Sequence, residues 1–218
     1  MGVAPAPGLL ARGPWDAEQV RARWREEEFE PPPAATAVGD AALDALRDRG
    51  SPTHDGLSAR MASFEAAPDR LEIELEPVRW SLRLAPESAE GISALCVVRD
   101  GEGRWLAGRR AAWVASWAGR WALGAGGAVD LGESPAQTLA RELHEEWSVT
   151  AQRLTVEALV RLPSGLVLLV GMAHLPSGAE VAMDPEHDAY AWWPAEIDAW
   201  PAEADEPLRR MASLLAAG

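Results

Sequence analysis

The sequence has 218 residues, 48 % of them hydrophobic and 25 % charged, with a formal net charge of −14 at pH 7. This excess of negative charge repels the phosphate backbone of nucleic acids and excludes sequence-independent DNA or RNA binding. No stretch approaches the ~20 apolar residues of a membrane-spanning helix. The segment from Met1 to Trp15 lacks the charged start and apolar run of a secretory signal, so we expect a cytoplasmic protein without a membrane partner.

The basic residues and the single cysteine limit the reactions that this chain could catalyse. All 20 basic residues are arginine, and there is no lysine or asparagine. This excludes a lysine-dependent phosphate loop, a Schiff-base enzyme and a protein kinase. Cationic chemistry must therefore come from arginine or from a metal ion. The single cysteine, Cys96, lies in an apolar run and cannot form an internal disulfide, which fits a reducing compartment and an inert core thiol.

The first third of the chain carries few clear patterns. We predict a short helix over 15–29, ended by the three prolines at 31–33, and a second short helix over 40–49. Residues 71–84 alternate apolar and acidic side chains, which predicts a half-exposed strand interrupted at Pro77.

From Gly91 onward, strands and helices alternate more clearly. Two apolar segments flank the turn sequence 100–103, a glycine-rich stretch covers 121–127 and a helix follows it. A second hairpin turns at 163–165. We predict strands over 92–98, 104–109, 154–162, 166–174 and 190–193, and closing helices over 195–199 and 206–216. Intermixed strands and helices indicate an α/β or α+β fold with a mixed sheet.

The helix after the glycine-rich stretch carries the most informative residues. Ser134 suits its N-cap, Pro135 its first position and Gln137 the return partner of a capping box. Further along, Glu142, Glu145 and Glu146 fall within an arc of roughly 100° on one side of the helix. Leucine and alanine side chains occupy the neighbouring arc and can pack on a sheet.

Three carboxylates this close are unfavourable for an isolated helix. They repel each other one turn apart, and they lie in the C-terminal half, where the helix dipole disfavours negative charge. A divalent cation with oxygen ligands removes the conflict. A solvated acidic face is the alternative reading of the helix alone.

The residues around the helix favour the metal. Gly127 is followed after five residues by Glu133, and after seven more by Arg141-Glu142-Leu143; Glu145-Glu146 and Ser148-Val149 follow, each after one residue. This stretch resembles the Nudix box and matches eight of its nine specified positions at the family spacing. Ser148 replaces the last glycine at a place where the chain often needs a left-handed turn, which glycine adopts without steric cost.

The resemblance implies a Nudix-type α/β/α sandwich with a mixed sheet over 89–218, preceded by an N-terminal extension over 1–88. It implies metal-dependent hydrolysis of a diphosphate linkage, with Mg²⁺ or, alternatively, Mn²⁺. The expected substrate is a nucleoside diphosphate derivative, an NDP-sugar or ADP-ribose first and a nucleoside triphosphate second. Glu142, Glu145 and Glu146 would hold the metal with the Gly127 carbonyl, while Arg141 and Glu133 would orient loop and helix.

Other residues are weaker candidates for substrate contact. Arg109 and Arg110 end a strand facing the box and could bind phosphate as bidentate donors. Trp113 and Trp117 could stack on a base, although core or dimer packing is the alternative. Glu186, with Asp188 two residues later, is a candidate general base on a loop after the box, or else a solvated loop acid.

The extension leaves several interpretations open. Its pattern faintly resembles the leading domain of the UDP-glucose pyrophosphatase branch of the family, but it could equally complete the sheet or build a homodimer interface. Some Nudix domains have lost activity and sense a ligand, so a sensor or binding module is the alternative function. All glutamates of the box are present, which favours an enzyme.

Overall fold

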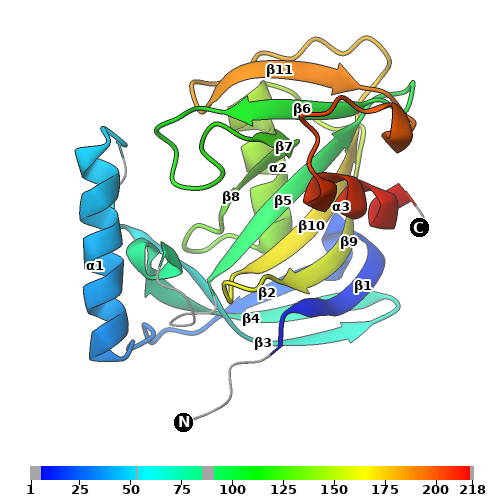
Figure 1. Ribbon diagram of the computed structural model, residues 1–218. Helices are drawn as coiled ribbons and strands as arrows, with labels where there is room; N and C mark the ends of the chain where they lie inside the picture. The colour runs from blue at the N-terminus through cyan, green and yellow to red at the C-terminus, as the bar shows by residue number, and fades with distance from the viewer. Residues whose placement is uncertain (1–5, 53, 85–90, 217–218) are drawn as a thin grey trace.

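The computed structural model describes residues 6–52, 54–84 and 91–216, and its strands form two sheets (Figure 1). The larger sheet has eight strands in the order β1-β9-β10-β5-β6-β11, with β7 paired to β6 and β8 paired to β5. Strands β10 and β5 are parallel and the other pairs in this sheet are antiparallel, so the sheet is mixed, as predicted. The strands are β1 (Gly8–Asp16), β5 (Ile92–Arg99), β6 (Trp105–Arg110), β7 (Trp121–Leu123), β8 (Ala125–Ala128), β9 (Arg153–Arg161), β10 (Val167–His174) and β11 (His187–Trp193).

The central strand β5 separates two hydrophobic cores. Cys96 and Val98 belong to the core that also contains Leu139 and Leu143 of α2 (Pro135–Trp147). Val97, between them, belongs to a second core with Leu208 and Ala212 of α3 (Glu206–Ala216). Successive side chains of a strand point to opposite faces of the sheet. The two helices therefore cover opposite faces (Figure 1), which confirms the α/β/α expectation.

The extension has two parts with different attachments. Strand β1 pairs antiparallel with β9 and lies at one edge of the large sheet. A separate three-stranded sheet follows, in the order β2-β4-β3, with β2 at Val20–Trp24, β3 at Leu57–Ala67 and β4 at Arg70–Arg79. Buried side chains of this sheet join the same core as α2. The extension also contains α1 (Pro33–Asp48) and two short 3₁₀ helices, η1 (Ala17–Gln19) and η2 (Trp80–Leu84).

The small sheet is joined to the large one by main-chain contacts. Ser58 and Asp130 form an isolated antiparallel bridge, and the Ala59 N–H donates to the Val129 carbonyl at 2.9 Å. The Trp24 indole N–H donates to the carbonyl of Glu133 at 2.8 Å. The extension lies outside the residues that resemble the Nudix box, and it therefore supports the loop of the box between β8 and α2 through these contacts.

The helix predicted over 15–29 is wrong. These residues form the end of β1, the turn η1 and strand β2. Val20, Ala22 and Trp24 pack on the core while the arginines between them point outward, a period of two that fits a strand. The arginine and glutamate content favours a helix only weakly, and parallel pairing with β4 overrides it.

The other predicted elements agree more closely with the structure. The strand predicted over 71–84 is present but shorter, as β4, in which Leu71, Ile73 and Leu75 are fully buried. The interruption predicted at Pro77 is wrong, because β4 continues through Pro77, which pairs with Ala59 of β3. The second hairpin is confirmed as β9 and β10. The helix over 40–49 is the second half of the longer α1, and the helix over 195–199 is only a 3₁₀ turn, η3 (Ile197–Ala199).

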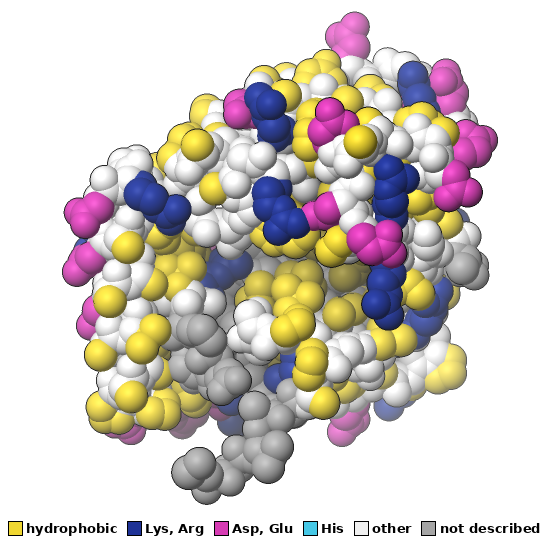
Figure 2. Space-filling model, in the orientation of Figure 1, with side chains coloured by type: hydrophobic (Ala, Val, Ile, Leu, Met, Phe, Trp, Pro, Cys, Tyr) yellow, Lys and Arg dark blue, Asp and Glu magenta, His cyan; other side chains and the backbone are white. Residues whose placement is uncertain are grey.

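The charges on the surface and the lengths of the helices are consistent with the composition of the sequence. Figure 2 shows arginine side chains interspersed with acidic ones on the visible face, without a continuous basic area. Among the described residues, none of the helices has the length and apolar character that crossing a membrane requires.

Candidate active site

Helix α2 begins as its sequence predicts. The Gln137 N–H donates to the Ser134 hydroxyl at 3.2 Å, and the Ser134 N–H donates to the Gln137 side-chain oxygen at 2.8 Å. This reciprocal capping box satisfies backbone groups that the first turn leaves unpaired, and Pro135 occupies a position that needs no donor. The cap fixes where the helix starts and therefore the direction in which its glutamates point.

The helix ends at Ser148 in the left-handed conformation, with φ 55° and ψ 33°. The Ser148 N–H still donates to the His144 carbonyl at 2.9 Å. The sequence departs from the family pattern at this residue, and glycine is the residue that takes this conformation without strain. Ser148 therefore keeps the left-handed helix end, and the departure removes no carboxylate.

We expect Ser148→Gly to stabilise the protein. Relief of the left-handed strain is worth about 1 kcal/mol, which corresponds to a rise in Tm of roughly 2–4 °C for a chain of this length. Thermal unfolding followed by circular dichroism measures it. Ser148→Ala is the control, because it keeps the Cβ atom and should bring no gain. An unchanged Tm in the glycine variant would mean that its greater unfolded-state freedom cancels the relief.

The three glutamates of α2 differ in exposure. The side chain of Glu145 is 56 % exposed, whereas those of Glu142 and Glu146 are 12 % and 4 % exposed. Burial raises the pKa of Glu142 to about 7 and raises the pKa of Glu146 well above its ordinary range. Two carboxylates are therefore held where water stabilises their charge poorly, and a nearby positive charge would compensate them.

The glycines of β8 form the surface against which these carboxylates lie. The Gly126 N–H donates to Glu146 at 3.1 Å. A Cβ atom on Gly127 would lie 2.0 Å from Glu142 Oε1, so only glycine leaves room for the carboxylate in this position. The glycine-rich stretch thus brings main-chain groups into contact with both buried carboxylates.

Arg141 connects the residues of the box. Its guanidinium donates to Glu133 at 2.9 Å, to Glu142 at 2.7 Å, to Glu145 at 2.9 Å and to the Ala128 carbonyl at 3.1 Å. The predicted pairing of Arg141 with Glu133 is thus present. Within the described part of the chain, no three acidic, histidine or cysteine side chains converge as a metal-binding group. Arg141 instead bridges Glu142 and Glu145, and a cation bound there would take over part of its role.

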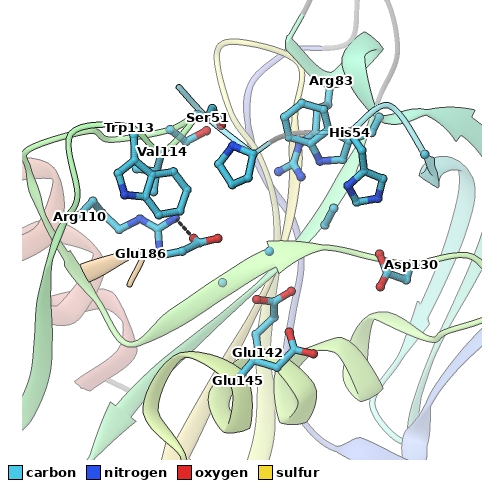
Figure 3. A pocket seen from close by; sticks show the side chains of 18 of the residues that line it. Ser51, His54, Arg83, Arg110, Trp113, Val114, Asp130, Glu142, Glu145 and Glu186 are labelled. Atoms are coloured by element: carbon cyan, nitrogen blue, oxygen red, sulfur yellow. Dashed lines mark hydrogen bonds and ion pairs between the residues drawn. The ribbon is translucent and has the colours of Figure 1, made fainter. Parts of the chain in front are cut away.

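A cleft of about 390 Å³ opens above these carboxylates, and residues from both parts of the chain line it (Figure 3). Glu142 and Glu145 point into it from α2. Counting the residues that the structure describes, its charged lining has four carboxylates and two arginines, an excess of two negative charges; these are Asp130, Glu142, Glu145, Glu186, Arg83 and Arg110. An anionic ligand would be repelled unless a cation accompanies it.

Two observations show that the carboxylates of α2 suit a divalent cation. The carboxylate oxygens offered are hard donors of the kind that Mg²⁺ and Mn²⁺ prefer. The burial of Glu142 and Glu146 leaves their charge without the solvation that a cation would replace. The Gly127 backbone lines the same cleft.

The predicted substrate-binding residues divide into two groups. Arg110, Trp113 and Glu186 line the cleft, and Arg110 donates to Glu186 at 2.7 Å (Figure 3). Arg109 and Trp117 do not line it. Arg109 donates to Asp188 at 2.6 Å, and Trp117 lies exposed in the loop after β6. The structure therefore brings three of the five candidates to the site.

Sequence analysis missed His187, which lies behind the carboxylates. Its side chain is 1 % exposed, with Nδ1 3.2 Å from Asp184 and Nε2 3.6 Å from Glu146 Oε2. Its ring packs against the Trp147 ring at a tilt of 37°, with 4.6 Å between centroids. No motif marks this histidine, because the fold brings it to the helix from a distant strand. The residues that the extension supplies to the cleft were missed for the same reason; they are Ser51, Pro52, His54, Gly56, Leu57, Trp80 and Arg83.

Comparison with protein families supports the resemblance of residues 127–149 to the Nudix box. The model of the NUDIX domain matches residues 89–214, more than half of the chain. The chain belongs to the Nudix family. A curated octanoyltransferase of Myxococcus xanthus is 41 % identical over 73 residues, which are 30 % of this chain and 20 % of that protein. The match thus spans about a fifth of that relative's length, which is too short to assign an acyl-transfer activity to this protein.

Solved structures resemble part of the chain. The MutT protein of Methanosarcina mazei Go1 is 23 % identical, with a TM-score of 0.46, and the match covers 59 % of this chain and 96 % of that one. The Nudix domain of Shewanella oneidensis NrtR, solved with ADP ribose, is 22 % identical, with a TM-score of 0.47, and the match covers 59 % and 89 %. Likeness at this level of identity concerns the fold alone.

We expect Cys96, the single cysteine, to be chemically inert in the folded protein. Its side chain is fully buried in β5, and burial raises the pKa of its thiol to about 12. A thiolate nucleophile needs a lowered pKa and access. A colorimetric thiol reagent should therefore titrate no thiol in the native Nudix protein at pH 8 and one per chain in guanidinium. Rapid labelling of native protein would contradict this and reopen cysteine chemistry.

Proposed function

We propose that this Nudix protein is a divalent-metal-dependent hydrolase that splits a diphosphate linkage in a nucleoside diphosphate derivative. One observation carries the proposal: two buried carboxylates, Glu142 and Glu146, lie against the Gly126-Gly127 backbone, and Glu142 also lines a cleft with an excess of negative charge. Family membership supports the reaction class.

The residues of the box would have two roles: some would bind the cation, and the others would hold those ligands in position. Glu142, Glu145 and Glu146 would hold the cation, Mg²⁺ or Mn²⁺, together with the Gly127 carbonyl. When bound, such a cation neutralises phosphate oxygens and lowers the pKa of water. Arg141 restrains Glu142 and Glu145 through the contacts described above. Glu133, itself bonded to the Thr138 hydroxyl at 2.8 Å, anchors Arg141.

The residues of the cleft wall would receive the rest of the substrate. Trp113 offers an aromatic face for stacking. Glu145 and Glu186 are more exposed than Glu142 and are the candidates to accept the proton of the attacking water. Each of them pairs with an arginine, Glu186 with Arg110 at 2.7 Å and Glu145 with Arg141 at 2.9 Å. NDP-sugars and ADP-ribose are the first substrates to examine, and nucleoside triphosphates the second.

A substrate panel tests the proposal. Purified protein is incubated with UDP-glucose, ADP-ribose, NADH, diadenosine polyphosphates and nucleoside triphosphates, with Mg²⁺ and separately with EDTA, and nucleoside monophosphate or phosphate release is measured. We expect turnover of at least one sugar-linked diphosphate that disappears with EDTA and falls strongly in Glu145→Gln. Tight ligand binding without turnover on any member would instead favour a ligand-sensing Nudix domain.

A further inference from the structure

Arg83 is a cleft residue that the box does not contain. It lies in η2, directly after the last strand of the extension, and faces the cleft across from Glu142 and Glu145 (Figure 3). Its guanidinium donates to the Ser93 hydroxyl at 2.6 Å and lies 5.5 Å from the centre of the Trp80 ring. Within the part of the chain that the structure describes, this hydrogen bond leaves most of the five donors of the guanidinium without a partner.

Within the described ranges, no acidic side chain forms an ion pair with Arg83. By contrast, Arg110, on the other wall, lies 2.7 Å from Glu186 and 3.5 Å from Glu146. Burial lowers the pKa of Arg83 to about 10. Arginines that lose solvent in folded proteins are normally paired with an acid. An anion from outside the chain would supply the missing partner.

The position of Arg83 places this anion close to the carboxylates of α2. Its hydrogen-bond partner Ser93 pairs with Ala128 across β5 and β8, next to Gly127. The Glu142 carboxylate is near enough to favour the charged form of Arg83. An anion in the cleft would therefore be held between the guanidinium on one side and a cation on the carboxylates on the other.

We propose that Arg83 binds a non-bridging oxygen of the substrate's diphosphate, so that the extension supplies part of the substrate site of this Nudix domain. A guanidinium matches phosphate oxygens with paired donors. Trp80 from the extension and Trp113 from the loop after β6 line the same cleft and present aromatic faces to an attached base. The ligand class is a nucleoside diphosphate or its ester. This inference rests on the proposed function for its substrate class.

Equilibrium binding of α,β-methylene-ADP, whose diphosphate cannot be hydrolysed, tests the inference with Mg²⁺ present. Isothermal titration is carried out on wild type, Arg83→Gln, Arg83→Lys and Arg153→Gln. Arg153 is an exposed arginine at the start of β9, outside the cleft, so its variant matches the change in charge. We expect at least tenfold weaker binding in Arg83→Gln, a smaller loss in Arg83→Lys and less than a twofold change in the control.

Unfolding without ligand separates binding from a structural role. Because Arg83→Gln removes an unpaired charge from a partly buried place, its Tm should equal or exceed that of wild type. A large fall in Tm together with lost binding would make Arg83 a structural residue and overturn the inference. Unchanged affinity in Arg83→Gln, or no binding of the analogue by wild type, would also overturn it.

The two proposals fail in different ways. If wild type turns over a panel substrate with Mg²⁺ and Arg83→Gln shows the same KM and kcat, the hydrolase stands and the inference fails. If no substrate is turned over while α,β-methylene-ADP binds in an Arg83-dependent manner, the inference stands and the hydrolase fails. If both hold, KM should rise at least tenfold in Arg83→Gln.

Discussion

Glu146→Gln should lower kcat on the preferred substrate on the order of 10³-fold, which corresponds to about 4 kcal/mol of activation free energy. The variant keeps the shape of the side chain, and its amide oxygen can still accept the Gly126 N–H that Glu146 accepts at 3.1 Å. It loses the negative charge that a divalent cation requires of its ligand. The measurement is steady-state hydrolysis with Mg²⁺ varied to saturation, because weakened metal binding and a slower chemical step then separate.

The same substitution should leave the fold intact or make it more stable. Burial raises the pKa of Glu146 in the folded protein well above the 4.5 of an exposed glutamate. A raised pKa costs folding free energy as the pH rises above the unfolded value, since the folded chain must take up a proton or bury a charge. Without metal, the Tm of Glu146→Gln should therefore exceed that of wild type at pH 8, and by less at pH 5. A lower Tm at pH 8 would assign Glu146 a structural role and weaken the activity argument.

The catalytic helix could be predicted because its determinants are local. The capping box and the spacing of the three glutamates lie within 14 residues, from Ser134 to Trp147, and a helix converts that spacing directly into one face. The left-handed conformation of Ser148 followed from the same short stretch.

The walls of the cleft could not be predicted in the same way. Arg109 and Arg110 are adjacent on a strand, and adjacent side chains point to opposite faces, so only one could reach the cleft. The sequence does not say which face that is. It is Arg110, and Arg109 pairs with Asp188 instead.

The extension was misread because its structure depends on distant residues. Val20–Trp24 becomes a strand by pairing in parallel with Leu71–Leu75, about fifty positions later. A local pattern cannot report such a partner, although the alternation of arginine with apolar residues was consistent with a strand. Arg83 reaches the box residues for the same reason: strands β5, β6 and β7 separate it from them in the sequence.

Gly127→Ala should reduce kcat about 100-fold while leaving the protein folded, because a displacement of about 1 Å at a catalytic group costs that much. The new Cβ atom would meet Glu142 Oε1 at 2.0 Å and Cδ at 2.4 Å. These atoms are the end of a flexible side chain, so the carboxylate can move and the backbone need not. Thermal unfolding should show a Tm within about 3 °C of wild type, roughly 1 kcal/mol for this chain length.

Gly124→Ala is the matched control, three residues earlier in the same glycine-rich stretch. There a Cβ atom would meet the Cys96 carbonyl oxygen at 1.8 Å, and φ is +62°. Backbone in the middle of the large sheet cannot move aside, so this variant should lose more than ~3 kcal/mol of stability. If both variants lost stability equally, the loss of activity in Gly127→Ala would reflect the fold and would not bear on the carboxylate.

A double-mutant cycle decides whether the Gly127 effect acts through Glu142. Glu142→Asp shortens the side chain by one methylene and withdraws its carboxylate from the new Cβ atom. In the wild-type background this substitution should lower activity, because the shorter carboxylate no longer reaches its place beside Arg141. In the Gly127→Ala background it should cost much less or restore part of the activity, since the clash is relieved. Coupling of this sign is expected only between groups in contact. Purely additive losses would mean that the alanine disturbs the cleft elsewhere and that the Gly127 backbone, more than the room it leaves for Glu142, matters to the site.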